Sequence, residues 1–253
     1  MIQQDPAPNN TQNTNSNQWY ASWFNTPYYH ILYKDRDNQE AQSFMDNLTG
    51  YLNLPDNAKI LDLACGKGRH STYLNKLGFD VTGADLSVNS IEKASVFSNP
   101  TLQFVVHDMR LPFAKKFDAI FNLFTSFGYF DHDQDHLATL KAISSSLSDY
   151  GFGVIDFMNV NHVRENLVPE ETKLIDGIEF QIKRHATNQH IIKDIRFTAA
   201  GTDFHFTERV RALTLENFEH MMEQAGIYLL DVFGDYKLRK FTANSERLIL
   251  IFK

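Results

Sequence analysis

The sequence is short of cysteine, of positive charge and of long apolar runs, and each shortage excludes a class of protein. Its single cysteine, Cys65, cannot form an intrachain disulfide and favours a reducing compartment, so we expect a cytoplasmic protein. Against 31 Asp and Glu residues stand 24 Lys and Arg residues, and the formal net charge of −7 argues against a nucleic-acid partner. No apolar run approaches the roughly 20 residues that a membrane-spanning helix needs, so we expect no membrane partner.

Apolar residues are nevertheless plentiful enough for a packed core, because 43% of the 253 residues are hydrophobic. Residues 1–18 are the exception, since they are rich in Asn, Gln, Thr and Pro, and we expect a disordered tail there. Residues 19–58 begin with the aromatic stretch "WYASWFNTPYYHILY", in which Pro27 suits a first helical position, and continue with apolar residues at helical spacing. We therefore predict an N-terminal aromatic arm followed by an amphipathic helix.

Strand-like and helix-like segments alternate through residues 59–166, which predicts a doubly wound α/β fold, a mostly parallel sheet with helices on both faces. The alternation stops in residues 167–213, where short strand-like runs are separated by turn signals such as Asp176-Gly177. We expect an antiparallel insertion of three or four strands there. Residues 214–253 return to a helix and two strands that complete the core.

The first strand-like run ends in a glycine-containing loop, "ILDLACGKGRH", at residues 60–70. Ligands of doubly wound folds bind at the carboxyl ends of the strands, and Gly66 and Gly68 remove side chains where a backbone turns and approaches a ligand. The loop alone would also suit an ordinary tight turn. A pyrophosphate-binding loop usually carries a third glycine, whereas this chain has Ser71 there, and polar Asp62 suits a cationic ligand group better than a phosphate.

Two later strand-like runs also end in carboxylates. Asp85 lies 23 residues beyond Asp62, a spacing that suits a carboxylate binding both hydroxyls of a ribose; the alternative is a helix cap, a role for which Ser87 is already available. Asp108 and Met109 follow the third run, where a carboxylate accepts from an exocyclic amine and a thioether packs on a purine face. Alone, that pair would suit a surface Asp and a core Met. In series, the three strand ends predict a site for an adenosine-containing ligand.

These motifs, in this order, resemble those of the class I S-adenosylmethionine-dependent methyltransferases. The first loop resembles the family's first motif, "GADLS" its ribose motif, "HDM" its adenine motif, "FDAIFNLFTSFGYF" its fourth-strand motif and "LTLENFEHMMEQAG" its penultimate helix. The resemblance covers roughly residues 46–253, and the aromatic arm is similar to one seen in bacterial members of the small-molecule type. It implies a seven-stranded Rossmann-like sheet, S-adenosylmethionine as cofactor and methyl transfer to a small-molecule acceptor.

By this resemblance, the first loop would hold the methionine part of the cofactor. Asp62 would bind the methionine ammonium, directly or through water. The backbone of Ala64, Gly66 and Gly68 would lie against the methionine part. His70 would touch the cofactor carboxylate or the arm, or would serve only as a packing residue.

The same resemblance assigns the adenosine to the next two strand ends. Asp85 would bind the ribose hydroxyls, and Leu86 would pack on the adenine. Asp108 would accept a hydrogen bond from the adenine amine beside Met109.

The fourth strand and the arm would then surround the methionine and the sulfonium. Asn122 and Leu123, which end the fourth strand, would face the sulfonium end. Tyr28 and Tyr33 in the arm would close over the methionine carboxylate, or would simply belong to a core.

We therefore predict a methyltransferase whose β insertion roofs an acceptor pocket lined by Phe127, Tyr129 and Phe130. Two other classes stay open from the sequence: a non-catalytic S-adenosylmethionine-binding protein and a nicotinamide-dependent oxidoreductase. The sequence identifies no catalytic base, no metal site and no acceptor beyond its small-molecule class. An exposed strand edge in the insertion could pair two chains as a homodimer.

Overall fold

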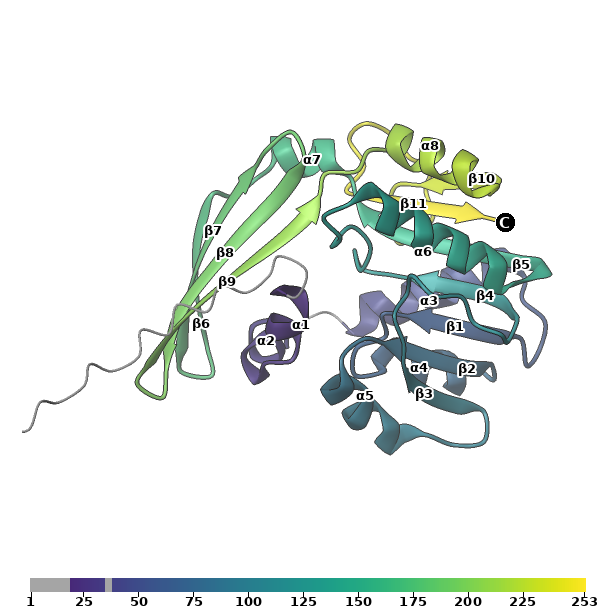
Figure 1. Ribbon diagram of the computed structural model, residues 1–253, viewed down its shortest axis with the longest axis horizontal. Coiled ribbons are helices and arrows are strands. Elements are labelled where there is room, and N and C mark those ends of the chain that lie inside the picture. The colour runs from purple at the N-terminus through teal and green to yellow at the C-terminus, as the bar shows by residue number, and fades with distance from the viewer. Residues whose placement is uncertain (1–18, 35–37) are drawn as a thin grey trace, which may run out of the picture.

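Two β-sheets and an N-terminal helical arm make up the protein in a computed structural model (Figure 1). The structure describes residues 19–34 and 38–253, so the tail predicted for residues 1–18 lies outside the described residues. One sheet has seven strands and the other has four. No helix in the described part of the chain is long and apolar enough to cross a membrane.

The seven-stranded sheet has the order β10-β11-β5-β4-β1-β2-β3. Strands β1 to β5 all run parallel to one another, and β11 runs antiparallel to both of its neighbours, β5 and β10. This arrangement confirms the predicted doubly wound sheet, and it puts the switch in strand order between β1 and β4, where ligands of such sheets bind. The strands are β1 (Lys59–Leu63), β2 (Asp80–Asp85), β3 (Leu102–Val106), β4 (Phe117–Asn122), β5 (Leu147–Met158), β10 (Leu229–Phe233) and β11 (Arg247–Phe252).

Helices cover both faces of this sheet, because each face carries its own apolar cluster. On one face, α3 (Asn38–Leu52) and α4 (Arg69–Lys76) pack through Phe44, Leu48 and Leu74. On the other face, α6 (Asp133–Ser146) and α8 (Leu215–Ala225) pack through Leu140, Ile143 and Phe218. Helix α5 (Val88–Ala94) lies against β2 and β3, and continues as a short 3-10 turn, Ser95–Phe97. One short helix, α7 (Val160–Glu165), has no counterpart in the sequence prediction.

The second sheet is the predicted antiparallel insertion, with four strands in the order β6-β7-β8-β9. Its strands are β6 (Glu170–Ile175), β7 (Ile178–Ala186), β8 (His190–Ala199) and β9 (Thr202–Arg211). The β6–β7 turn is Asp176-Gly177, with φ values of 50° and 77° that suit Asp and Gly at a tight hairpin. In Figure 1 this sheet projects away from the seven-stranded core as a long curved ribbon.

The arm consists of α1 (Trp19–Phe24) and α2 (Pro27–Leu32), and Figure 1 shows both helices between the second sheet and the core. Thr26 caps α2 by accepting a hydrogen bond from the N–H of Tyr29, with Pro27 at the first helical position as predicted. The arm supplies part of the second sheet's apolar cluster, which buries Trp23 and Leu32 with Phe180, Ile182, Ile195, Phe197 and Ala199. The arm and the second sheet therefore share one core.

Candidate functional site

The loop between β1 and α4 has three residues with left-handed backbone. Ala64, Gly66 and Gly68 have φ values of 66°, 56° and 75°. A side chain on Gly66 would meet no atom within 4 Å, so this position is open, whereas one on Gly68 would come within 2.4 Å of the Phe104 ring. Gly66 therefore leaves room at the loop surface, and Gly68 allows α4 to pack on β3.

Asp62 lies in β1 beneath this loop and is 2% exposed. The hydroxyl of Ser71 donates to Asp62 Oδ2 at 2.6 Å. Burial raises the pKa of Asp62 to about 6, although the hydrogen bonds from Ser71 act in the opposite direction. A cationic group placed nearby would stabilise the ionised form and bring this pKa down again.

Asp85, at the end of β2, is held in place by two backbone N–H groups. Gly66 donates to one carboxylate oxygen at 2.9 Å and Ser87 donates to the other at 2.8 Å. Burial raises the pKa of Asp85, and these two hydrogen bonds oppose the rise. Each oxygen keeps a lone pair that can accept a further hydrogen bond. The neighbouring Leu86 is 44% exposed.

Asp108 and Met109 follow β3, where Arg110 contacts the Asp108 carboxylate through Nε at 3.0 Å and Nη2 at 2.6 Å. Burial acts to raise the pKa of Asp108, but the hydrogen bonds and charge of Arg110 outweigh it, so the pKa lies below its usual value. Arg110 also contacts Asp135 of α6 at 3.0 Å. The Asp108 carboxylate therefore stays ionised, and Arg110 links it to α6.

The end of β4 is fully buried at Asn122, whose amide donates to the Leu63 carbonyl at 3.0 Å. The Asn122 side-chain oxygen has no hydrogen-bond partner among the residues that the structure describes. The next residue, Leu123, is also buried but contributes to the cavity wall, and Phe124 after it stacks on His70 with ring centroids 4.6 Å apart. His70 Nε2 accepts from Arg69 Nε at 3.2 Å.

One cavity of about 530 Å³ joins these strand ends to the arm. Most of the predicted site residues line it: Tyr33, Asp62, Ala64, Gly66, His70, Asp85, Leu86, Asp108, Met109 and Leu123. Three do not, namely Tyr28, Gly68 and Asn122. The structure thus brings the three strand-end carboxylates and the glycine loop to one place.

The arm and the chain after β4 form the other end of this cavity. Phe24 and Tyr29 of the arm face Tyr129 and Phe130 there, and the Phe24 and Tyr129 ring centroids are 5.4 Å apart. Phe127 was expected in this wall but is fully buried in the core, where it packs on Phe218.

Two arm tyrosines have different surroundings. Tyr28 packs between Phe197 and Phe204 of the second sheet, with ring centroids 4.8 and 4.9 Å away. Tyr33 lines the cavity, and its hydroxyl donates to the Glu208 carboxylate at 2.7 Å. Burial raises the pKa of Tyr33 well above its usual value, with Glu208 adding to the rise, so the phenol stays protonated.

Sequence reasoning did not select several other lining residues: Phe24, Tyr29, His30, Lys34, Lys67, Arg69 and Ser90. Lys67 and Arg69 stand inside the glycine loop motif, and that adjacency was a signal for including them. Cys65 also lines the cavity, but burial strongly raises the pKa of its thiol, which therefore stays protonated and is no nucleophile. Among the described residues, no group of three or more His, Cys, Asp or Glu side chains could hold a metal ion.

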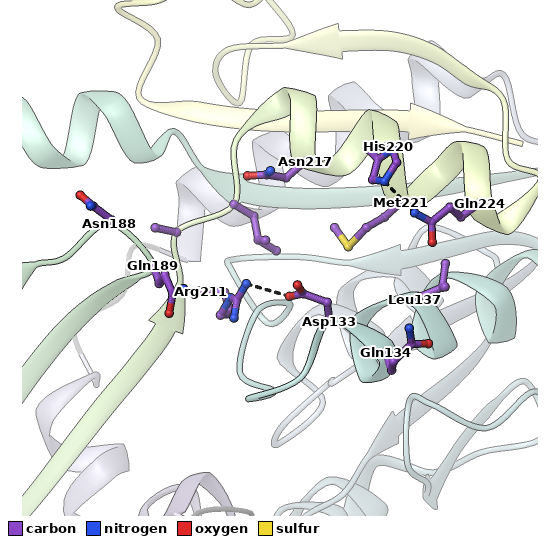
Figure 2. A pocket seen from close by; sticks show the side chains of 12 residues that line it. Asp133, Gln134, Leu137, Asn188, Gln189, Arg211, Asn217, His220, Met221 and Gln224 are labelled. Carbon is purple, nitrogen blue, oxygen red and sulfur yellow. Dashed lines mark hydrogen bonds and ion pairs between the residues drawn. The ribbon is translucent and has the colours of Figure 1, made fainter.

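A second cavity of about 390 Å³ lies between α6, α8 and the base of the second sheet (Figure 2). Two pairs of its polar side chains contact one another: Arg211 pairs with Asp133 at 2.7 Å, and Gln224 contacts His220 at 2.7 Å. None of the predicted site residues lines it. The larger cavity is therefore the candidate functional site.

Comparisons with known proteins agree with this geometry. Residues 33–232 match the family described as methyltransferase domain. The putative methyltransferase YqeM of Bacillus subtilis is 30% identical over 207 residues, which cover 77% of this chain and 83% of that protein. A glycine/sarcosine N-methyltransferase of Halorhodospira halochloris is 31% identical over 190 residues, which cover 71% of this chain and 69% of that protein.

The fold is also that of solved methyltransferases. A crystal structure of an S-adenosylmethionine-dependent methyltransferase from Clostridium acetobutylicum superposes with a TM-score of 0.75 at 22% identity, over 89% of this chain and 95% of that one.

Proposed function

Since this chain belongs to the methyltransferase-domain family and is an S-adenosylmethionine-dependent methyltransferase, we propose that its larger cavity holds the cofactor beside a small-molecule amine. The observation that carries the proposal is that one cavity of about 530 Å³ has two chemically different parts. One end has strand-end carboxylates and the glycine loop, and the other has aromatic rings. A volume of this order suits a cofactor with a small ligand.

The residues at the carboxylate end fit S-adenosylmethionine. The open space at Gly66 admits a ligand against the loop backbone, and Asp85 has two fixed oxygens for the ribose hydroxyls. We assign the methionine ammonium to Asp62. Lys67 and Arg69 also line the cavity, and their positive charges suit the methionine carboxylate.

The bound cofactor supplies a methyl group on a positively charged sulfur. The protein has to align this group with the acceptor atom, and good alignment contributes about 7–11 kcal/mol to lowering a barrier. Leu123 and Phe124, which follow β4, line the cavity, and we assign them the part of the wall nearest the methyl group.

An amine acceptor is favoured by the aromatic end. The rings of Phe24, Tyr29, Tyr129 and Phe130 line this part of the cavity, and aromatic rings attract an ammonium group or an amine nitrogen that becomes positive as it takes the methyl group. The amine must lose its proton before it can attack a methyl group. A related protein, the glycine/sarcosine N-methyltransferase of Halorhodospira halochloris, is named for transfer to nitrogen. The proposal includes a cytoplasmic location, supported by the single, buried cysteine.

Calorimetric titration with S-adenosylmethionine, S-adenosylhomocysteine and NAD tests the cofactor assignment. We expect the two sulfur nucleosides to bind and NAD not to bind. Asp85→Ala should weaken their binding at least about tenfold, because ribose hydrogen bonds to a charged group are lost. The matched control is Asp149→Ala, which removes an exposed carboxylate near the start of β5, at the edge of the sheet away from the cavity. This variant should bind like the wild type. Equal binding by Asp85→Ala would contradict the assignment.

The acceptor is tested with S-adenosylmethionine that carries a labelled methyl group. The protein is incubated with a panel of small primary and secondary amines, and with hydroxyl compounds, a mixed peptide library and RNA as comparisons. We expect label on an amine of low molecular mass. Label on oxygen, or on peptide or RNA alone, would overturn the amine proposal.

A further inference from the structure

The backbone that follows β4 adopts a conformation that is uncommon for its residues. Phe124 and Thr125 have φ values of 57° and 60°. This left-handed region is unusual for residues other than glycine, and it is an outlier for a β-branched residue such as threonine. Such residues persist only where their surroundings hold them. Because residues 123–126 line the larger cavity, the shape of that wall depends on what holds this segment.

Both left-handed residues are tied to one residue of the neighbouring strand. The N–H of Phe124 donates to Asp156 Oδ2 at 2.7 Å. The N–H of Thr125 donates to the backbone carbonyl of Asp156 at 2.9 Å. Asp156 belongs to β5 and is 0% exposed. The buried strand therefore fixes the backbone of the segment at two successive positions.

Arg247 completes this anchor; it is the first residue of β11, which pairs with β5 on the side opposite β4. Its Nε and Nη2 donate to Asp156 Oδ1 at 2.8 and 2.7 Å, and Nη2 also donates to Thr125 Oγ1 at 3.0 Å. The Tyr236 hydroxyl adds a contact of 3.3 Å to Asp156 Oδ2. Removing one member of a buried, hydrogen-bonded ion pair leaves the other charge without compensation.

The anchored segment reaches the glycine loop through the ring of Phe124. That ring stacks on His70 with an interplanar angle of 16°, and the Arg69 guanidinium lies 5.8 Å from its centroid. His70 and Arg69 both line the cavity, in the part that we assign to the methionine end of the cofactor. A change in the Phe124 backbone would therefore move the surface against which both side chains rest.

We propose that Arg247 and Asp156 are positioning residues that hold Phe124 and Thr125 in the left-handed conformation and so shape the methionine end of the cavity. Neither Arg247 nor Asp156 is part of the cavity lining, so they act through the segment. This inference rests on the proposed placement of the cofactor.

The test compares two ligands in Arg247→Met by calorimetric titration. S-adenosylhomocysteine contains the amino-acid part, whereas 5′-methylthioadenosine keeps the adenosine and lacks that part. We expect the Kd of S-adenosylhomocysteine to rise about tenfold or more and that of 5′-methylthioadenosine to stay within about twofold. Arg239→Met removes an exposed ion pair with Asp235 and is the matched control, which should change neither Kd.

A rescue variant separates positioning from general damage. Glycine adopts the left-handed conformation without a steric penalty, so Thr125→Gly in the Arg247→Met background should recover part of the lost S-adenosylhomocysteine affinity. Asp156→Asn, which keeps the side-chain shape, should show the same selective loss and serves if Arg247→Met does not fold. Equal loss of both ligands, or no loss in a folded variant, would overturn the proposal. Failure of the wild-type protein to bind S-adenosylhomocysteine would instead overturn the proposed cofactor site.

Discussion

At the scale of single residues, Asp62, to which we assign the methionine ammonium, carries a stability penalty. Its carboxylate is buried and its pKa is raised to about 6, whereas an unfolded Asp titrates near 3.9. The folded protein therefore keeps the Asp62 proton over a pH range in which the unfolded chain has lost it. From this group, stability is greatest below about pH 4 and falls as the pH rises to about 6.

Asp62→Asn should consequently be more stable than the wild type at pH 8, by about 3 kcal/mol for a pKa difference of roughly two units. The advantage should shrink below pH 6 and disappear near pH 4. Urea unfolding of both proteins at pH 4.5, 6 and 8 measures this difference in the free energy of unfolding. His136, whose pKa burial lowers to about 4, changes stability with pH in the opposite direction in both proteins, so the difference between them removes its contribution. A difference that does not vary with pH would contradict this account.

The strand-end carboxylates were predictable because their positions follow from local pattern. Asp85 and Asp108 stand where apolar runs end, Asp62 is the penultimate residue of β1, and parallel strands bring such ends to one edge of the sheet. The separate roles of Gly66 and Gly68 were not predictable, because the ring that requires Gly68 belongs to Phe104 of β3, which lies two strands from β1 in the sheet. The anchor formed by Arg247 depends on a pairing of β11 with β5 that no local signal encodes.

At the scale of elements, one carboxylate of the second sheet holds the arm by hydrogen bonds, in addition to the apolar core that the two share. Glu208 of β9 accepts from Trp23 Nε1 at 2.7 Å and from the Tyr33 hydroxyl at 2.7 Å. Lys193 of β8 lies 3.7 Å from the same carboxylate and also contacts the Tyr33 hydroxyl. The arm in turn carries Phe24 and other residues of the cavity wall. The second sheet thereby determines where one wall of the site stands.

Glu208→Gln should loosen the arm, because the amide oxygen is a neutral and weaker acceptor for Trp23 and Tyr33. The amide NH2 group also replaces an oxygen that accepts from Tyr33, and the negative charge beside Lys193 is lost. We expect the free energy of unfolding to fall by about 1–3 kcal/mol and S-adenosylhomocysteine to bind more weakly. Trp23 fluorescence, measured in a Trp19→Phe background, should shift to longer wavelength. Glu179→Gln, an exposed position on β7, is the control and should leave the emission unchanged. Unaltered Trp23 emission in Glu208→Gln would contradict this role for the carboxylate.

The helices and strands of the core were predictable from periodicity and from caps such as Ser87, which caps α5 in the structure. The partner of the arm was not, because an aromatic stretch shows that a segment will be buried but not against what. Tyr28 illustrates the difference. The sequence around Tyr28 suited either a ligand contact or a core position. In the structure Tyr28 packs on Phe197 and Phe204, which are about 170 residues away in the chain.

At the scale of the whole molecule, the protein has a core that is independent of the arm. Of the residues that the structure describes, none before Ala41 belongs to the two apolar clusters on the faces of the seven-stranded sheet. The third cluster, by contrast, needs Trp23 and Leu32 to cover Phe180 and Phe197 of the second sheet. The arm is thus part of the second sheet's hydrophobic core, and burial of such side chains drives folding.

Removal of residues 1–34 should therefore leave the seven-stranded core folded and uncover one face of the second sheet. We expect a cooperative thermal transition, strong binding of the dye ANS and rapid hydrogen exchange in β7 and β8. S-adenosylhomocysteine affinity should fall, since the arm wall of the cavity is missing. A truncated chain without any cooperative transition would show that the core does depend on the arm.

The contact between Trp23 and Glu208 also determines how late in synthesis the arm can fold, because the two residues are 185 positions apart in the chain. At 5–20 residues per second, the ribosome needs roughly 10 to 40 s to make the partner of an aromatic arm that it has already released. The seven-stranded sheet is equally delayed, since its β11 comes last. During that interval the nascent chain presents an uncovered aromatic surface, the kind of segment that chaperones bind. The enclosed site is therefore among the last parts of the protein to form.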